Sequence, residues 1–296
     1  MKVKDYAKII RAKFLVLSTF ITFTAASLAV YEGVFSLFHS LLGFLILILF
    51  HISVNSLNVA RDYRSGIDAE TEKTPFSGGV KVLTSGTLRY RSAVFIGLLP
   101  IGLSLPIFAY FGLKFDIWIV STIFLSAVIL AVGYTDIFVK NFLGEISAGI
   151  GLGALPMLSI FFFQNGSLSL SSIFVSISMF IPAFNLLLIN EFPDIEVDRK
   201  HGRRNIPIAL GKENAVRVYQ ASNILFTLTT ILLVILEFLP IFTVFSTVPA
   251  LISLKLSGDI SENNYEVEFK HMKSNAILTH SIFLFEGLSL ILTSIT

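Results

Sequence analysis

Apolar runs long enough to span a membrane alternate with short polar segments along the whole chain. A helix needs roughly 20 apolar residues to cross the hydrocarbon core of a bilayer, and nine stretches have this length. They lie near residues 14–33, 37–58, 92–112, 116–134, 143–163, 170–190, 215–236, 237–255 and 275–295. We divide the long seventh run at Glu237 and Pro240, since both residues suit a turn at the membrane surface. The pattern predicts an all-α, polytopic membrane protein with nine transmembrane helices, and residues 1–296 form one domain.

Composition agrees with a membrane protein and removes several other classes. The chain is 54% hydrophobic and only 14% charged, whereas a soluble domain has roughly 25% charged residues. A net charge of +2 is too small to indicate nucleic acid as a partner. The absence of cysteine from the sequence excludes disulfides and cysteine-ligated zinc.

Lysine and arginine gather in alternate loops and so predict an orientation. They are frequent before residue 14 and in the loops that follow the second and sixth spans, but absent from "YEGVFS" and "QNGSLSLSS". Positive loops tend to stay in the cytoplasm. We therefore expect a multi-pass protein of the cell membrane, with a cytoplasmic N-terminus and cytoplasmic loops at about 59–91, 135–142 and 191–214. Four spans separate the two charged loops, which suggests two four-helix blocks and one extra helix.

The first of these loops begins with an acidic stretch, "NVARDYRSGID", at residues 58–68. If the second helix continues through Asp62, Asn58 and Asp62 lie on one face, about 40° apart around the axis. Asp68 is six residues further on, about 120° away on a regular helix, so it cannot join them there. Gly66 offers a way, because a left-handed glycine commonly ends a helix and turns the chain back.

The second acidic stretch is "NEFPDIEVDRKHGRRN", residues 190–205. Helical periodicity predicts that one asparagine and three acids of this stretch lie in one stripe, and that Glu196 points away from it. The stripe contains Asn190, Glu191, Asp194 and Asp198. Pro193 is expected to bend or start this segment.

Two acidic clusters on one membrane face indicate a cation site. Carboxylates held close together repel one another unless a cation neutralises them. Mg²⁺ takes one or two carboxylates and completes its shell with water and substrate phosphate, so the clusters, which lie beside Arg and Lys, suggest a Mg²⁺-bound diphosphate. The alternative interpretation is that these residues are solvated loop charges and helix caps.

At these residues the sequence resembles the UbiA superfamily of intramembrane prenyltransferases. That family has nine helices around a central cavity, an Asn/Asp-rich motif after helix two and a DxxxD-type motif after helix six. The usual first motif, NDxxDxxxD, stands here as NxxxDxxxxxD on Asn58, Asp62 and Asp68. This variant is most similar to the menaquinone-pathway branch, which acts on 1,4-dihydroxy-2-naphthoate. The same branch is resembled by three further segments: "DYRSGID", "NEFPDIEVDRKHGRRNIPIALG" and "YTDIFVKNFLGE". "RAKF" stands where many relatives have Arg-Pro.

The resemblance implies a Mg²⁺-dependent prenyl transfer within the membrane. The donor would be a polyprenyl diphosphate such as geranylgeranyl diphosphate, and its allylic carbocation would be captured by an aromatic or lipid acceptor, in quinone biosynthesis. Tyr134 would lie near the reacting carbons, or serve instead as an interfacial aromatic anchor. The implied metal ligands are Asp62, Asp68, Asp194, Asp198 and Asn58, and Asn190 would assist at the diphosphate.

Basic residues near the clusters are candidates to bind the diphosphate. Lys140 matches a family lysine, and Lys73, Lys81 and Arg203 lie close to the acidic stretches in the sequence. Binding of anionic lipid is the alternative role for these side chains. The polar residues 71–86 would form either a lid over the site or a plain connector.

A cation-coupled secondary transporter is the competing hypothesis. Repeated helical blocks and acids at helix ends occur in transporters. Their sites lie near the middle of the membrane, however, whereas the acids here cluster at one face. The sequence favours the enzyme.

Overall fold

The chain folds into a bundle of long helices. The computed structural model describes residues 3–71, 80–258 and 265–296, and these contain no β-strand. The α-helices are α1 (Val3–Ile9), α2 (Val16–Tyr31), α3 (Leu37–Ser65), α4 (Ile67–Glu70), α5 (Tyr90–Lys114), α6 (Ile117–Gly133), α7 (Gly144–Gly149), α8 (Leu155–Asn165), α9 (Leu170–Asn190), α10 (Ile195–Lys200), α11 (Ile206–Leu210), α12 (Lys212–Ile235), α13 (Thr247–Leu256) and α14 (Tyr265–Ile295). Short 3₁₀ and π segments join several of them: η1 (Ala12–Leu15), η2 (Tyr134–Phe138), η3 (Val139–Asn141), η4 (Ile150–Ala154), η5 (Phe192–Asp194) and η6 (Ile241–Ser246).

Eight continuous helical segments in the described ranges are long and apolar enough to cross a membrane. The ninth predicted span is a shorter apolar helix, Ile241–Leu256. The predicted division of the long apolar run is also present, because α12 ends at Ile235 and Glu237 takes a left-handed φ of 62°. Pro240 then precedes η6. The nine predicted helices therefore correspond to the observed ones.

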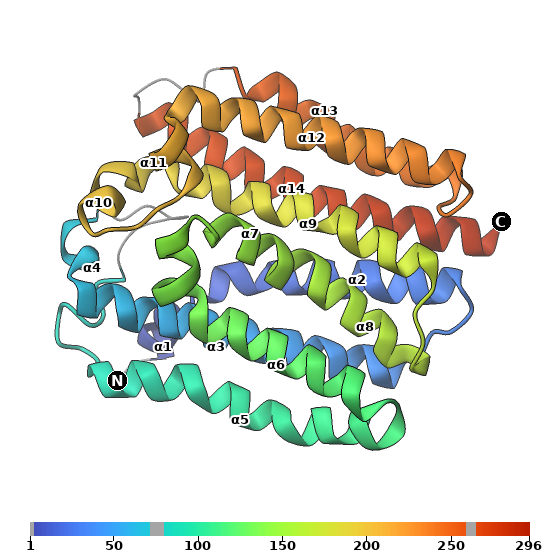
Figure 1. Cartoon of the computed structure of the whole chain (residues 1–296), viewed down its shortest axis with the longest axis horizontal. Coiled ribbons are helices and arrows are strands. Elements are labelled where there is room, and N and C mark those ends of the chain that lie inside the picture. Colours follow the sequence, from blue (N-terminus) through green and yellow to red (C-terminus); the bar gives the residue numbers. More distant parts are fainter. Residues whose placement is uncertain (1–2, 72–79, 259–264) are drawn as a thin grey trace.

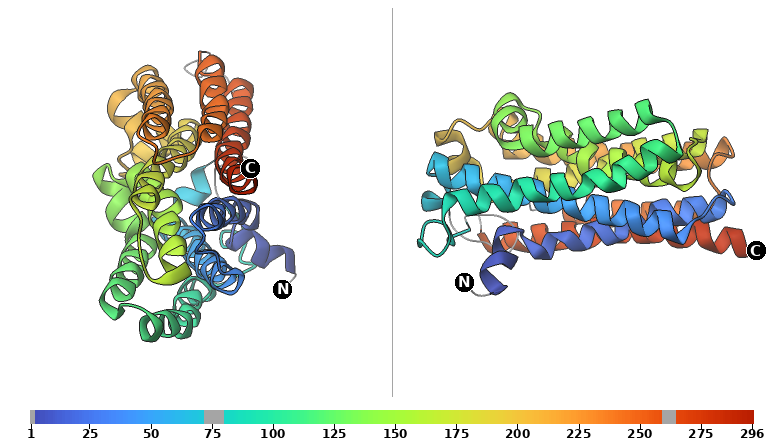
Figure 2. Two further views of the ribbon diagram at one scale, coloured as in Figure 1. Left: turned by 90° about the vertical axis from the view of Figure 1, so that its right-hand side faces the viewer. Right: turned by 90° about the horizontal axis from the view of Figure 1, so that it is seen from below.

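The spans run side by side and the last closes against the first. α14 packs against α2, and α3 packs against α5, α6 and α8 (Figures 1 and 2). The short helices α4, α10 and α11 lie together at one end of the bundle, whereas the C-terminus lies at the other (Figure 1). This arrangement brings both acidic stretches to the same end.

Small residues let the inner helices approach closely. A Cβ at Gly153 would lie 2.3 Å from the carbonyl oxygen of Met179, and one at Gly149 would lie 2.5 Å from the Phe180 ring. The segment α7–η4 therefore packs closely on α9, as small residues allow in membrane bundles. A group of phenylalanines forms a second apolar core, where Phe111 and Phe163 stack with ring centroids 4.1 Å apart.

Candidate active site

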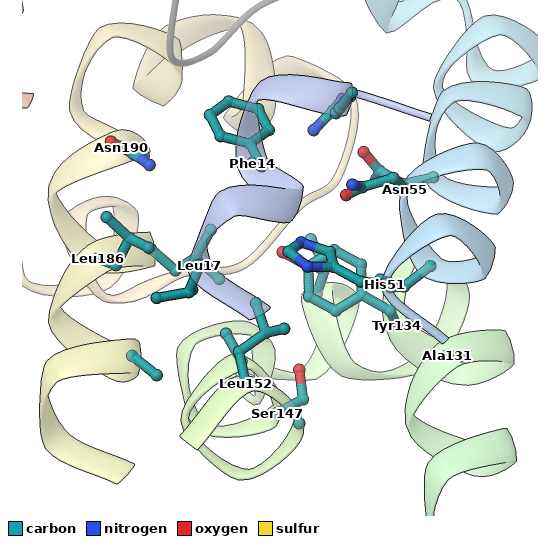
Figure 3. A pocket seen from close by; sticks show the side chains of 18 of the residues that line it. Phe14, Leu17, His51, Asn55, Ala131, Tyr134, Ser147, Leu152, Leu186 and Asn190 are labelled. Atoms are coloured by element: carbon teal, nitrogen blue, oxygen red, sulfur yellow. The ribbon is translucent and has the colours of Figure 1, made fainter. Parts of the chain in front are cut away.

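A cavity of about 360 Å³ lies inside the bundle. Its lining includes α4 and α10 residues at one end and reaches Leu47 and Leu155 deeper in the bundle. Leu17 from α2, His51 from α3 and Asn190 from α9 converge on it (Figure 3). No residue of α5, α12 or α13 belongs to its lining, so these helices support the site from outside. The volume lies within the usual range for small-molecule sites.

The first acidic stretch enters the cavity through a helix and a glycine turn. α3 continues to Ser65, so Asn58 and Asp62 share one face and both line the cavity. Gly66 ends α3 with a left-handed φ of 85°. The chain then turns into α4, which buries Asp68 in the same lining. The expected glycine turn is therefore present.

The second acidic stretch reaches the cavity through a broken helix. α9 ends at Asn190, the 3₁₀ turn η5 carries Pro193, and α10 follows. The stretch is thus not one regular helix, because proline interrupts the backbone hydrogen bonds. Its predicted stripe nevertheless lines the cavity as a set: Asn190, Glu191, Asp194 and Asp198. Glu196 points away and pairs with exposed Arg199.

Arg203 joins the two stretches at the cavity. One guanidinium nitrogen donates to Asp62 from the first stretch, and the other lies 3.2 Å from Asp198 Oδ1 in the second. Arg11 approaches Asp62 as well, at 3.8 Å. The Arg203 side chain is 20% exposed, and those of Asp62 and Asp198 are 7% and 3% exposed. Two buried acids from distant parts of the sequence therefore share one cation.

The charge on these groups follows from their surroundings. Burial raises the pKa of the Asp68 carboxyl to about 7, and repulsion from Asp62 adds to this effect while Arg11 opposes it. Within the described ranges, the buried Asp68 Oδ2 has no hydrogen-bond partner. Burial alone would lower the pKa of Arg203, but the carboxylates of Asp62 and Asp198 raise it instead. The guanidinium therefore stays charged.

Tyr134 faces the same cavity from the end of α6. It begins the π-helical turn η2, whose next residue, Thr135, accepts a hydrogen bond of 3.1 Å from Asn58 Nδ2. Single π-turns are often found at functional sites. Here the turn fixes Asn58 and presents the tyrosine to the cavity (Figure 3).

Of the three predicted basic residues that the structure describes, two lie outside the lining. Lys140 pairs with exposed Asp136 at 3.9 Å, because η3 directs it outward. Lys81 lies in an exposed position, and Lys73 lies outside the described residues. Neither Lys140 nor Lys81 lines the cavity, so direct binding of a diphosphate by these two lysines does not fit this geometry. Of the described members of this set, Arg203 lines the cavity.

The possible lid is described only in part, since residues 72–79 lie outside the described ranges. Thr71 lines the cavity. Val82 and Leu83 are buried against Val59 at the end of α3. The described part of the segment is thus packed on the helix that carries the first acidic stretch.

Several lining residues were not among the sequence candidates. Arg11 and Lys13 enter the cavity because the chain turns at Arg11, whose φ is 48°. The signal was the "RAKF" segment, where relatives carry Arg-Pro. His51 and His280 also line the cavity, although the sequence analysis gave histidines no part in the site. His51 and Asn55 extend the polar face of α3 by whole helical turns, which the periodicity of that helix could have revealed.

Comparison with known proteins assigns the chain to a family. Residues 19–268 match the UbiA prenyltransferase family. The chain belongs to that family. It is therefore a membrane prenyltransferase, and the transporter hypothesis is set aside.

Individual relatives of this UbiA-family chain are distant. It is 28% identical over 177 residues to 1,4-dihydroxy-2-naphthoate octaprenyltransferase from Bacillus subtilis (strain 168). The match covers 58% of this chain and 54% of the relative, so the chain spans about half the length of that curated relative.

Solved structures share the fold over nearly the whole chain. A structure described for digeranylgeranylglyceryl phosphate synthase has a TM-score of 0.65 at 18% identity, covering 98% of both chains. A UbiA homologue from Archaeoglobus fulgidus bound to GPP and Mg²⁺ also has a TM-score of 0.65, at 16% identity, covering 97% of this chain and 99% of that one. At these identities the likeness shows the fold alone.

Proposed function

We propose that this protein transfers an isoprenyl group from a polyprenyl diphosphate to an aromatic or lipid acceptor within the membrane, with Mg²⁺. The observation that carries the proposal is the convergence of Asp62, Asp68, Asp194 and Asp198 at one end of a cavity whose deeper lining is apolar. A diphosphate needs the charged end, and a hydrocarbon tail needs the apolar part. One ligand with both features matches the whole cavity.

The residues present fit a Mg²⁺–diphosphate pair. Carboxylate and amide oxygens are the ligands that Mg²⁺ prefers, and the ion usually keeps water and substrate phosphate in its shell. No group of three or more Asp, Glu or His side chains in the described ranges is arranged to hold a metal by itself. This agrees with an ion that arrives together with a phosphate. Asp68 Oδ2 is buried and has no hydrogen-bond partner within the described ranges, so it would be available as a ligand.

We assign the metal to Asp62, Asp68, Asp194, Asp198 and Asn58. The chemistry that Mg²⁺ supplies when bound is neutralisation of the charge on the departing diphosphate. An ion held by these residues would compete with Arg203 for the carboxylates of Asp62 and Asp198. A guanidinium released from one carboxylate would donate to phosphate oxygens, as arginine commonly does, and Asn190 would donate to them through its side-chain N–H group.

Aromatic side chains border the place where the reacting carbon would lie. Tyr134, Phe14 and Phe50 line the cavity, and an aromatic face stabilises a nearby cation. As the C1–O bond breaks, the allylic cation is thus held next to ring faces instead of water. The acceptor is proposed to be an aromatic ring of the kind used in quinone biosynthesis, supported by the name of the Bacillus subtilis relative.

The test is transfer by purified protein with matched variants. We expect Asp62→Asn and Asp198→Asn each to lower kcat/KM at least ~100-fold, as loss of one electrostatic contact to a developing charge does. The assay uses radiolabelled geranylgeranyl diphosphate, 1,4-dihydroxy-2-naphthoate and Mg²⁺, and identifies the product by mass. The same assay with a glycerol-lipid acceptor in place of the aromatic one shows which of the two acceptor classes the protein uses.

Asp136→Asn is the control. This acid lies at the same end of the bundle but pairs with Arg61 at 2.5 Å on the surface and does not line the cavity. It should retain wild-type transfer. Unchanged turnover in both Asp62→Asn and Asp198→Asn, or transfer that persists after chelation of Mg²⁺, would contradict the proposal.

A further inference from the structure

A polar strip on α3 continues from the charged end of the cavity into its apolar part. Asp62, Asn58, Asn55 and His51 are spaced by three or four residues, so they share one face of the helix, and all of them line the cavity. His51 lies three helical turns before Asp62, roughly 16 Å along the axis. A diphosphate held at Asp62 does not extend so far. The deeper part of the strip therefore faces another part of the substrates.

A contact with α2 holds the His51 ring in one orientation. Its Nδ1 lies 2.9 Å from the hydroxyl oxygen of Ser18, and both residues are buried. Nε2 has no hydrogen-bond partner among the residues that the structure describes, and the ring faces the cavity (Figure 3). Whichever ring nitrogen carries the proton, Nε2 can still make one hydrogen bond, either as a donor or as an acceptor.

Asn55 lies one turn nearer the charged end, and a backbone contact fixes its amide group. Its Nδ2 donates a hydrogen bond of 3.0 Å to the carbonyl oxygen of Ile10, in the segment before η1. A carbonyl oxygen only accepts hydrogen bonds, so this contact identifies the amide nitrogen. In the described part of the chain Oδ1 has no partner. Asn55 is half-buried and lines the cavity (Figure 3), so Oδ1 is available to accept a hydrogen bond from a ligand.

The surroundings of these two side chains are apolar and aromatic. Leu47, Phe50 and Val54 of α3 line the cavity next to them, as does Leu17 of α2. A polar atom among such side chains costs free energy unless a partner hydrogen-bonds to it, and the isoprenyl tail of the donor has no group that does so. A hydroxylated aromatic ring does, because its hydroxyls donate and accept while its faces contact apolar and aromatic side chains.

We propose that His51 and Asn55 recognise the acceptor, a hydroxylated aromatic ring, by hydrogen bonds to its hydroxyl groups; this rests on the proposed function. The two residues are one helical turn apart, about 6 Å along the axis, which is close to the separation of hydroxyls on opposite carbons of one ring. His51 Nε2 binds the deeper hydroxyl, and Asn55 Oδ1 accepts from the hydroxyl nearer the charged end. The pair thereby orients the ring toward C1 of the donor and determines which acceptors bind. Ser18 is a positioning residue for His51.

The test measures acceptor binding by calorimetry, with Mg²⁺ and the unreactive analogue geranylgeranyl thiolodiphosphate already bound. The probes are 1,4-dihydroxy-2-naphthoate and two compounds that each lack one of its hydroxyls, 1-hydroxy-2-naphthoate and 4-hydroxy-2-naphthoate. In the wild type, loss of either hydroxyl should weaken binding about tenfold, since one hydrogen bond is lost and its protein partner is left unpaired. In His51→Leu the loss of one hydroxyl should change affinity less than threefold. In Asn55→Ala the same should hold for the other hydroxyl.

His39→Leu is the matched control. His39 is another buried histidine of α3, and its ring nitrogens lie 3.0 Å from the Gln164 carbonyl oxygen and from the Tyr110 hydroxyl, outside the cavity lining. This variant should bind all three probes like the wild type. All three variants should bind the donor analogue within threefold of wild type, and Asn55→Ala keeps the test decisive if His51→Leu does not fold.

Two results would overturn the inference. One is a tenfold loss for each missing hydroxyl that persists in both His51→Leu and Asn55→Ala, because these side chains would then only pack. The other is a wild-type protein that binds the donor analogue but none of the three naphthoates. A wild-type protein that neither binds the donor analogue nor shows Mg²⁺-dependent transfer would instead overturn the proposed function itself.

Discussion

At the scale of single residues, the unusual feature is one positively charged side chain, Arg203, that neutralises two acids of the cavity. Arg203 contacts Asp62 and Asp198, which are remote in the sequence. Buried carboxylates without a counter-charge are strongly destabilising. The arginine therefore supplies the counter-charge of both acids in the structure, and under the proposed function the metal would compete with it for them. Stability and ligand binding are coupled through one side chain.

This coupling predicts the behaviour of Arg203→Gln. Without Mg²⁺ the variant should lose ~3 kcal/mol or more of stability, because breaking a buried ion pair leaves its partners uncompensated. With Mg²⁺ and diphosphate much of the loss should return, since the ion replaces the missing charge. Thermal unfolding in detergent, with and without Mg²⁺ and pyrophosphate, measures both values.

Arg199→Gln is the control for that experiment, because Arg199 pairs with Glu196 on the surface and such pairs contribute little. It should unfold like the wild type in both conditions. A loss in Arg203→Gln that Mg²⁺ and pyrophosphate leave untouched would show that the arginine only packs the loop.

At the scale of elements, the join between α3 and α4 determines whether Asp68 reaches the site. Gly66 has a φ of 85°, and a Cβ there would meet only His201 Cε1, at an ordinary 3.7 Å. The penalty for Gly66→Ala is therefore one of backbone conformation, about 1–2 kcal/mol. Relaxation of that strain would move Asp68 away from Asp62. We expect Mg²⁺-dependent binding of a donor analogue to weaken roughly tenfold or more.

Gly33→Ala is the matched control, since Gly33 has a φ of 70° with open space around it and lies in the loop between α2 and α3. It should lose similar stability but bind the analogue normally. If Gly66→Ala also binds normally while folded, the glycine turn has no part in the site.

Helical spacing and glycine conformation predicted part of the site from the sequence. The positions of the other site residues depend on contacts between helices. Spacing along one helix placed Asn58 with Asp62, and the conformational freedom of glycine predicted the turn at Gly66. The same rules could not place Lys140, because its direction depends on the π-turn η2 and on pairing with Asp136. The contact of Ser18 with His51 joins α2 to α3, and no spacing within either helix encodes that contact.

At the scale of the whole molecule, the two ends of the bundle differ in charge. α4 and α10 form the charged end of the cavity, whereas the opposite end holds tight loops without lysine or arginine, such as the one before α9 (Figure 1). There Ser169 donates to Glu32 at 2.6 Å and ties two of these loops together. The asymmetry of loop charge predicts that the cavity end faces the cytoplasm.

That orientation is testable because the native chain contains no cysteine. Ser85→Cys places a single thiol in an exposed position of the loop between α4 and α5, and Ser167→Cys places one in an exposed position of the loop between α8 and α9. A membrane-impermeant maleimide should label Ser85→Cys only in inside-out vesicles and Ser167→Cys only in right-side-out vesicles. The two loops cap opposite ends of helices that cross the bilayer an odd number of times, so labelling of both from one side would contradict the fold. The reverse pattern would keep the fold but place the cavity end outside the cell, and the substrates would then have to be drawn from that side.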